Sequence, residues 1–343
     1  MDSVVAARFP LLAGTAANQV SDIGRSLIGS RGEETGAPPV PAVSCNDSEV
    51  RDWIALLKPR VMSLVVFSGL IGLLVAPGHL NPVLAFTAVL CIAVAAGACG
   101  AINMWYDRDI DAVMRRTRGR PIPAGRIEPG AALGYGITLA AGSVIVMGLA
   151  VNHVAAGVLA LSIAFYVFVY TMWLKRRTPQ NIVIGGAAGA FPPVIGWAAV
   201  TGSVDLIPLV LFAIIFVWTP PHFWSLALFA NDDYRRAKVP MLPVVAGGKE
   251  TRRQIVIYTL VLVPLSLAPW LLGFSGPVYA VAASALGAGF LVSVWRVATD
   301  RQDATGVSLT NDAPARAAFK FSIAYLFILF AALAIDHCIG RIL

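Results

Sequence analysis

Nine apolar runs, separated by short polar loops, occupy most of the chain from residue 61 onwards. Each run is close to the ~20 residues that a helix needs to cross the hydrocarbon of a membrane. The runs lie at 61–77, 82–106, 131–151, 153–174, 182–201, 205–229, 254–273, 277–296 and 317–339. This pattern predicts an all-α integral membrane protein with about nine transmembrane helices.

Lys and Arg residues occupy every second loop between these runs. They gather at 108–126, 175–177, 235–253 and 296–320, whereas the intervening loops carry none. Positively charged loops tend to remain on the cytoplasmic side of a membrane. We therefore expect a cytoplasmic N-terminus, an extracytoplasmic C-terminus and a cavity that opens toward the cytoplasm.

The composition agrees with this assignment. Only 13% of the residues are charged, against roughly 25% in soluble proteins. The net charge of +7 lies in the loops, so membrane orientation explains it better than binding to nucleic acid. Residues 1–50 mix Gly, Ser, Pro and both signs of charge, and we expect a mostly disordered tail before a transmembrane domain at 51–343. The acids in this tail argue against a mitochondrial presequence and favour a bacterial inner membrane.

The second run ends in the motif Asn103-x-x-x-Asp107-x-x-x-Asp111. On a helix these three side chains fall along one face, and Asp109 points to the opposite side. Carboxylate and amide oxygens are ligands that hard divalent cations prefer. The motif therefore predicts a cation site at the mouth of a span. The simpler interpretation is a solvated helix end whose acids pair with the Arg residues that follow.

A second acidic loop, with Asp232 and Asp233, follows the sixth run on the same membrane face. Two acidic helix ends suit an anionic diphosphate that is bridged by Mg²⁺, because carboxylates alone would repel it. Neighbouring Arg and Lys side chains would neutralise the remaining phosphate oxygens. An apolar chain on the diphosphate would lie among the spans. These residues indicate an enzyme that acts on a lipid diphosphate.

Several strings of residues resemble the UbiA superfamily of intramembrane prenyltransferases. They lie at 58–62, 103–126, 218–224 and 233–243, and the last two resemble the branch of the superfamily that modifies haem. The resemblance covers residues 58–253 and extends to about residue 340 through the plan of nine spans. It implies a UbiA-type fold, in which the helices form a ring around an intramembrane site.

The resemblance also implies a reaction. The farnesyl group of farnesyl diphosphate is transferred to a vinyl group of haem B, water adds, and the products are haem O and diphosphate. Haem B is then a substrate, Mg²⁺ is the cofactor, and a downstream haem A synthase is a candidate partner. Asn103, Asp107 and Asp111 would act in catalysis and would hold Mg²⁺ together with Asp233. The candidates for substrate binding are Arg60, Arg118, Arg120, Lys175, His222, Asp232 and Asp233.

The second acidic motif departs from the superfamily pattern Asp-x-x-x-Asp, because position 229 is Phe. Only Asp232 and Asp233 are available in this loop, which leaves the number of metal ions there open. The same departure fits the haem-modifying branch.

His222 lies about seven residues before the end of the sixth run, which is roughly 10 Å along a helix. An ionisable residue at that depth in a membrane is a functional candidate. We expect Pro220 and Pro221 to break the helix before it and to free backbone carbonyls. The imidazole would then either bind the haem iron or form a hydrogen bond with such a carbonyl.

Two alternative functions are also open. The acceptor could be a quinone precursor such as a hydroxybenzoate, although the strings of the haem-modifying branch argue against it. A transporter could also place acids and a histidine in its spans. Transporters usually carry such groups on broken helices near the middle of the membrane, whereas these acids lie at the cytoplasmic ends.

Overall fold

The computed structural model of the protein describes residues 48–303 and 306–342. The predicted tail at 1–50 therefore lies almost entirely outside the described residues. The described part is helical, and its β structure is confined to an isolated bridge between Gln302 and Ser308. The all-α prediction is confirmed.

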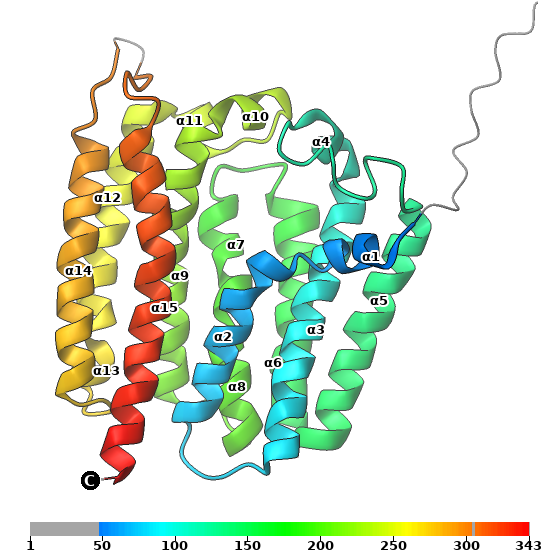
Figure 1. The fold of residues 1–343 in the computed structure, drawn as a ribbon, viewed down its shortest axis with the longest axis vertical. Coiled ribbons are helices and arrows are strands. Elements are labelled where there is room, and N and C mark those ends of the chain that lie inside the picture. The colour runs from blue at the N-terminus through cyan, green and yellow to red at the C-terminus, as the bar shows by residue number, and fades with distance from the viewer. Residues whose placement is uncertain (1–47, 304–305, 343) are drawn as a thin grey trace, which may run out of the picture. The chain divides into compact units, whose positions relative to one another are not determined.

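The long helices run side by side, as Figure 1 shows. In chain order the elements are α1 (Val50–Leu56), α2 (Pro59–Val75), α3 (Pro82–Tyr106), α4 (Arg108–Val113), α5 (Pro129–Val146), η1 (Met147–Val151), α6 (His153–Ala164), η2 (Phe165–Leu174), α7 (Asn181–Ala190), α8 (Pro192–Thr201), α9 (Leu206–Phe229), α10 (Asn231–Arg236), α11 (Leu242–Val245), α12 (Gly247–Ser266), α13 (Ala268–Leu271), α14 (Pro277–Ala298) and α15 (Ala313–Ile342). Proline occupies the first turn of α2, α3, α5, α8 and α14, where its missing N–H costs no helical hydrogen bond.

Eight helical stretches of the described chain are long and apolar enough to cross a membrane. Four of them combine two adjacent elements: α5 with η1, α6 with η2, α7 with α8, and α12 with α13. The remaining predicted span, at 61–77, is α2, which meets the short helix α1 at a bend of 53°. The predicted and observed boundaries agree closely except at the seventh span. That helix begins at Gly247 rather than at residue 254, because its charged first turns lie ahead of the apolar run.

The spans pack against one another in chain order, and the last contacts the first. Helix α2 contacts α3, α3 contacts α5, and the series continues through α6, α7, α9, α12 and α14 to α15, which packs on α2. These contacts close the predicted ring. The short helices α4 and α10, which carry Asp111 and Asp233, lie at the same end of the long helices (Figure 1).

Helices α2 and α8 approach each other unusually closely. A Cβ atom on Gly72 would lie 2.2 Å from the carbonyl oxygen of Pro193, and one on Gly196 would lie 2.0 Å from the carbonyl oxygen of Gly69. Small residues permit such backbone contacts between membrane helices. This contact fixes the position of α2, whose first residue follows Lys58.

Candidate active site

The first acidic motif is buried at the end of α3. Asn103, Asp107 and Asp111 are 4%, 0% and 2% exposed, whereas the side chain of Asp109 is 62% exposed. The predicted separation of the two faces is confirmed. The helix is not continuous, since α3 ends at Tyr106 and α4 begins at Arg108. The backbone N–H groups of Asp107 and Asp111 still donate to the carbonyls four residues earlier, at 2.9 and 2.8 Å, so the helical spacing survives the break.

Basic side chains from distant parts of the chain meet these buried acids. Lys58 Nζ donates to Asn103 Oδ1 at 2.8 Å, and Asn103 Nδ2 donates to Asp107 Oδ2 at 2.7 Å. Lys175 Nζ forms an ion pair with the same Asp107 oxygen. Arg120 Nη1 lies 2.6 Å from Asp111 Oδ2. The site is therefore an alternating network of acids and cations.

The electrostatics of the network follow from burial and from these neighbours. Burial, together with the charges of Arg120 and Lys175, lowers the pKa of Lys58 to about 7. Burial also opposes the charge of Lys175, but neighbouring Tyr170 and Asp107 outweigh it, and the pKa of Lys175 is raised. At the exposed edge, hydrogen bonds from Arg176 hold the pKa of Asp109 below its usual value.

The second acidic loop reaches the first. Asp233 Oδ1 accepts a hydrogen bond from the backbone N–H of Arg115 at 3.4 Å and forms an ion pair with Arg236. The two loops also share a small apolar core, in which Ile110 and Tyr234 are buried. Asp232 is exposed. The structure thus brings Asp233, but not Asp232, to the loop that follows the first motif.

The other predicted site residues also fall into two groups: those that contact the buried acids and those that do not. Lys175 and Arg120, our candidates for phosphate contacts, form ion pairs with Asp107 and Asp111. Arg60 and Arg118 are exposed, and neither side chain is among those that contact the buried acids. Sequence reasoning missed the direct contact of Lys58 and the hydroxyl of Thr171, which lies 3.3 Å from Asn103 Nδ2. The sequence feature that could have pointed to Lys58 is the Lys-Pro string directly before the first span.

The donor set suits Mg²⁺ in combination with a phosphate ligand. No three His, Cys, Asp or Glu side chains of residues 48–303 and 306–342 gather into a metal-binding group. Mg²⁺, however, is usually held by one or two carboxylates plus substrate phosphates rather than by a cage of protein ligands. Asp107 and Asp111 supply such carboxylates, and Asn103 supplies an amide oxygen. In this structure their oxygens face cationic side chains, which shows that they accept positive charge.

His222 lies in a sandwich of aromatic rings between α9 and α15. Its ring stacks on Trp218 and on Phe319, with centroids 4.3 and 4.7 Å apart, and its Nδ1 lies 2.7 Å from Ser322 Oγ. The partner is therefore a hydroxyl and not the backbone carbonyl that we expected as one alternative.

The predicted helix break before His222 is wrong. Helix α9 continues through Pro220 and Pro221. Neighbouring helices α7, α12 and α15 pack along α9. Proline is tolerated in membrane helices where packing and nearby hydroxyl groups stabilise the backbone, and Ser225 Oγ donates to the Pro221 carbonyl at 2.7 Å.

Comparisons with known proteins agree with this geometry. The family model described as the UbiA prenyltransferase family matches residues 65–323. Proteins named Protoheme IX farnesyltransferase from Granulibacter bethesdensis and Acidiphilium cryptum are 67% and 66% identical. The first alignment covers 89% of this chain and 96% of the relative, and the second covers 89% and 98%.

Solved structures share the fold at lower identity. A digeranylgeranylglyceryl phosphate synthase superposes with a TM-score of 0.68 at 17% identity, over 84% of this chain and 98% of that chain. A UbiA homolog from Archaeoglobus fulgidus bound to DMAPP and Mg²⁺ gives a TM-score of 0.59 at 18% identity, over 82% and 99%. These likenesses show the fold.

Proposed function

This chain belongs to the UbiA prenyltransferase family, and we propose that it transfers the farnesyl group of farnesyl diphosphate to a vinyl group of haem B, with hydration to haem O. The observation that carries this proposal is the meeting of two acidic loops with partly buried cations at one end of the helices. The relatives named Protoheme IX farnesyltransferase support the choice of acceptor.

The buried network would bind the diphosphate. Asn103, Asp107 and Asp111 would hold Mg²⁺, with Asp233 contributing from the second loop. A bound Mg²⁺ neutralises the negative charge that builds on a departing diphosphate. The cations that already lie beside these acids, Lys58 and Arg120 among them, would contact the remaining phosphate oxygens. The structure of the UbiA homolog bound to DMAPP and Mg²⁺ supports this combination of ligands.

The reaction breaks the bond between C1 of the farnesyl chain and the diphosphate oxygen, and the electron pair leaves with the diphosphate. The vinyl group of haem supplies the electrons for the new carbon–carbon bond. The carbon that is left electron-poor takes a hydroxyl group from water, and a proton is released. The protein has to hold the two substrates together and exclude water until the carbon–carbon bond has formed. The complete burial of Asp107 supports such a dry site.

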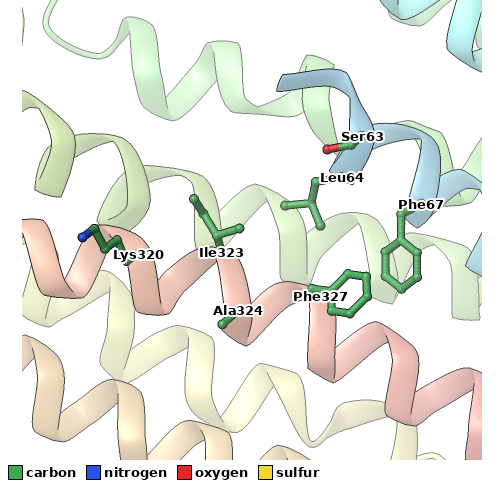
Figure 2. Close-up of a pocket in the computed structure, with 7 residues that line it drawn as sticks. All are labelled: Ser63, Leu64, Phe67, Lys320, Ile323, Ala324 and Phe327. Carbon is green, nitrogen blue, oxygen red and sulfur yellow. The ribbon is translucent and has the colours of Figure 1, made fainter. Parts of the chain in front are cut away.

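A groove between α2 and α15 is our candidate for the haem-binding site. Figure 2 shows its seven lining residues, which come from these two helices: Ser63, Leu64, Phe67, Lys320, Ile323, Ala324 and Phe327. Its volume is about 470 Å³, within the usual range of small-molecule sites. The lining is apolar apart from Ser63 and Lys320. An apolar macrocycle with carboxylates at one edge, which describes haem, matches this distribution.

The groove also lies near the donor site. Ser63 follows Lys58 by five residues, so the two are about 7–8 Å apart along the axis of α2, and Lys58 contacts Asn103. Lys320 lies about 10 Å from the start of α15. Lys320, whose side chain is exposed, would pair with a haem carboxylate. Phe319, the residue before it, stacks on His222, which supports a role of His222 beside the haem.

The membrane orientation follows from the loops. All the loops rich in Lys and Arg, at 108–126, 175–177, 235–253 and 296–316, connect helices on the side of the acidic motifs. We place this side in the cytoplasm of a bacterial inner membrane, with the C-terminus outside. Haem and farnesyl diphosphate would then reach the site from the cytoplasmic half of the bilayer, and a haem A synthase would take the product.

The experiment that tests the proposed function uses purified protein with Mg²⁺, haem B and farnesyl diphosphate, read by mass spectrometry beside an Asp107→Asn variant. We expect a farnesylated, hydrated haem that requires Mg²⁺ and disappears in the variant. Absence of any haem product, with prenylation of a hydroxybenzoate in the same tube, would replace the acceptor. Absence of both products would refute the function.

The haem groove has its own test. Lys320→Glu places a negative charge where the haem carboxylate is expected, so the KM for haem should rise while the KM for farnesyl diphosphate stays unchanged. Arg296→Glu on α14, an exposed cation away from the groove, is the matched control. Equal effects of the two variants would remove the groove from the proposal.

A further inference from the structure

A buried carboxylate lies outside both acidic motifs. Asp52, on the short helix α1, is 4% exposed. Its Oδ1 accepts a hydrogen bond from Arg126 Nε at 2.9 Å, and its Oδ2 is buried and has no hydrogen-bond partner among the described residues. Burying a carboxylate with an incomplete set of partners is costly. Apolar packing alone would attach α1 at lower cost, which suggests that the position of Arg126 matters.

The contacts continue from Arg126 to the acidic site. Arg126 Nη2 donates to the carbonyl oxygen of Gly119 at 3.1 Å, and the next residue, Arg120, forms the ion pair with Asp111 at 2.6 Å. Asp52 is thus connected through one side chain and one backbone carbonyl to the cation that faces a buried acid of the site.

Helix α1 is itself firmly attached. Leu56 is fully buried in an apolar cluster with Ile122 and Ile127 of the same loop that carries Arg120. Trp53 packs edge-on against Tyr135 of α5, with ring centroids 5.1 Å apart. Two residues after Leu56, Lys58 reaches Asn103. Helix α1 therefore connects the loop at 114–128 with the start of α2.

We propose that Asp52 is a positioning residue: through Arg126 it holds the loop at 114–128 so that Arg120 faces the diphosphate site. This inference rests on the proposed function, because Arg120 serves a phosphate ligand there. Asp52 touches neither substrate. Loss of its charge should weaken the binding of the diphosphate and leave the chemical step nearly unchanged, since the residues that surround the reacting atoms remain in place.

The test is a double-mutant cycle of Asp52→Asn and Arg120→Gln. The affinity for farnesyl diphosphate with Mg²⁺ is measured by calorimetry without haem, and KM and kcat are measured by haem product. We expect Asp52→Asn to weaken binding and raise the KM by about tenfold, with kcat changed less than about twofold. Because Asp52 acts through Arg120, the double variant should bind no more weakly than Arg120→Gln alone.

Two further variants keep this test decisive if Asp52→Asn folds poorly. Arg126→Gln breaks the same contact from the loop and must reproduce the rise in KM. Glu49→Gln is the matched control, because Glu49 also precedes α2 but is exposed and pairs with the exposed Arg51; it should behave as the wild type.

Additive losses in the double variant, or a fall in kcat at constant KM, would overturn the positioning role. If Asp52→Asn bound farnesyl diphosphate as tightly as the wild type does, this inference alone would be overturned. Failure of the wild type to bind farnesyl diphosphate with Mg²⁺ would overturn both the inference and the proposed function.

Discussion

Replacement of Lys175 by Met should destabilise the ligand-free protein and make its stability depend on Mg²⁺. Lys175 is paired with Asp107, and their side chains are 19% and 0% exposed. After the substitution, Asp107 keeps a hydrogen bond from Asn103 at 2.7 Å and the more distant guanidinium of Arg176 at 3.5 Å. Removing one partner of a buried pair costs about 3–5 kcal/mol. Because Arg176 remains and Lys175 is partly exposed, we expect a loss of about 2–3 kcal/mol.

Mg²⁺ should reverse much of this loss. A ligand that binds only the folded state at about a hundred times its Kd stabilises it by about 2.7 kcal/mol. In the wild type, Mg²⁺ must compete with Lys175 for Asp107, whereas in Lys175→Met only the more distant Arg176 offsets the charge of this carboxylate. The variant should therefore gain more stability from Mg²⁺ than the wild type does.

The assay is thermal unfolding in detergent with EDTA or with excess Mg²⁺. The matched control is Arg177→Met, which removes an exposed cation two positions away and should match the wild type in both conditions. If Mg²⁺ shifts the unfolding midpoints of Lys175→Met and wild type equally, Asp107 is not a metal ligand and this assignment fails.

Three further predictions concern the second acidic loop, a buried ion pair and His222. Asp233→Asn should lower kcat/KM for farnesyl diphosphate by about 10–100-fold, as loss of groups that support a metal site does. Asp232→Asn, at an exposed position, should leave kcat/KM unchanged. Steady-state kinetics check this, and equal losses in the two variants would contradict the role of Asp233. Arg252→Ala should destabilise the fold by about 3 kcal/mol or more, because Arg252 is buried and lies 3.6 Å from Asp300. Denaturant titration checks this, with the exposed Arg253→Ala as the control. Equal unfolding midpoints of the two variants would refute the prediction. Ser322→Ala should cost about 1–3 kcal/mol by leaving His222 Nδ1 unsatisfied, yet only His222→Ala should alter the absorption spectrum of bound haem. An unchanged spectrum in His222→Ala would remove this residue as an iron ligand.

The spans and the first acidic motif were accessible from sequence because both depend on local patterns. Apolar runs of the length of a membrane and the four-residue spacing of Asn103, Asp107 and Asp111 need no knowledge of distant contacts. The bend between α1 and α2 was less accessible. It arises where Lys58 adopts a left-handed conformation, with φ of 51°, directly before Pro59, and no apolar period marks such a point.

The remainder of the site depends on contacts between distant residues. Lys58 and Asn103 are 45 positions apart, and Asp52 and Arg126 are 74 positions apart. A pattern within one segment cannot reveal such pairs. The failed prediction at Pro220 and Pro221 has a similar cause, since local chemistry favours a break in the helix while packing against neighbouring helices keeps α9 intact.

In the proposed function, the pairing of acids with cations would allow one buried site to serve two states, without and with ligand. Without ligand, Asp107 and Asp111 are each compensated by a cation from another part of the chain, so their charges can remain buried. With diphosphate and Mg²⁺ bound, the carboxylates would face the metal ion and the same cations would face phosphate oxygens. The groups exchange partners, and no charged side chain has to enter from solvent. Fixed charges of this kind stabilise a leaving diphosphate without reorganisation.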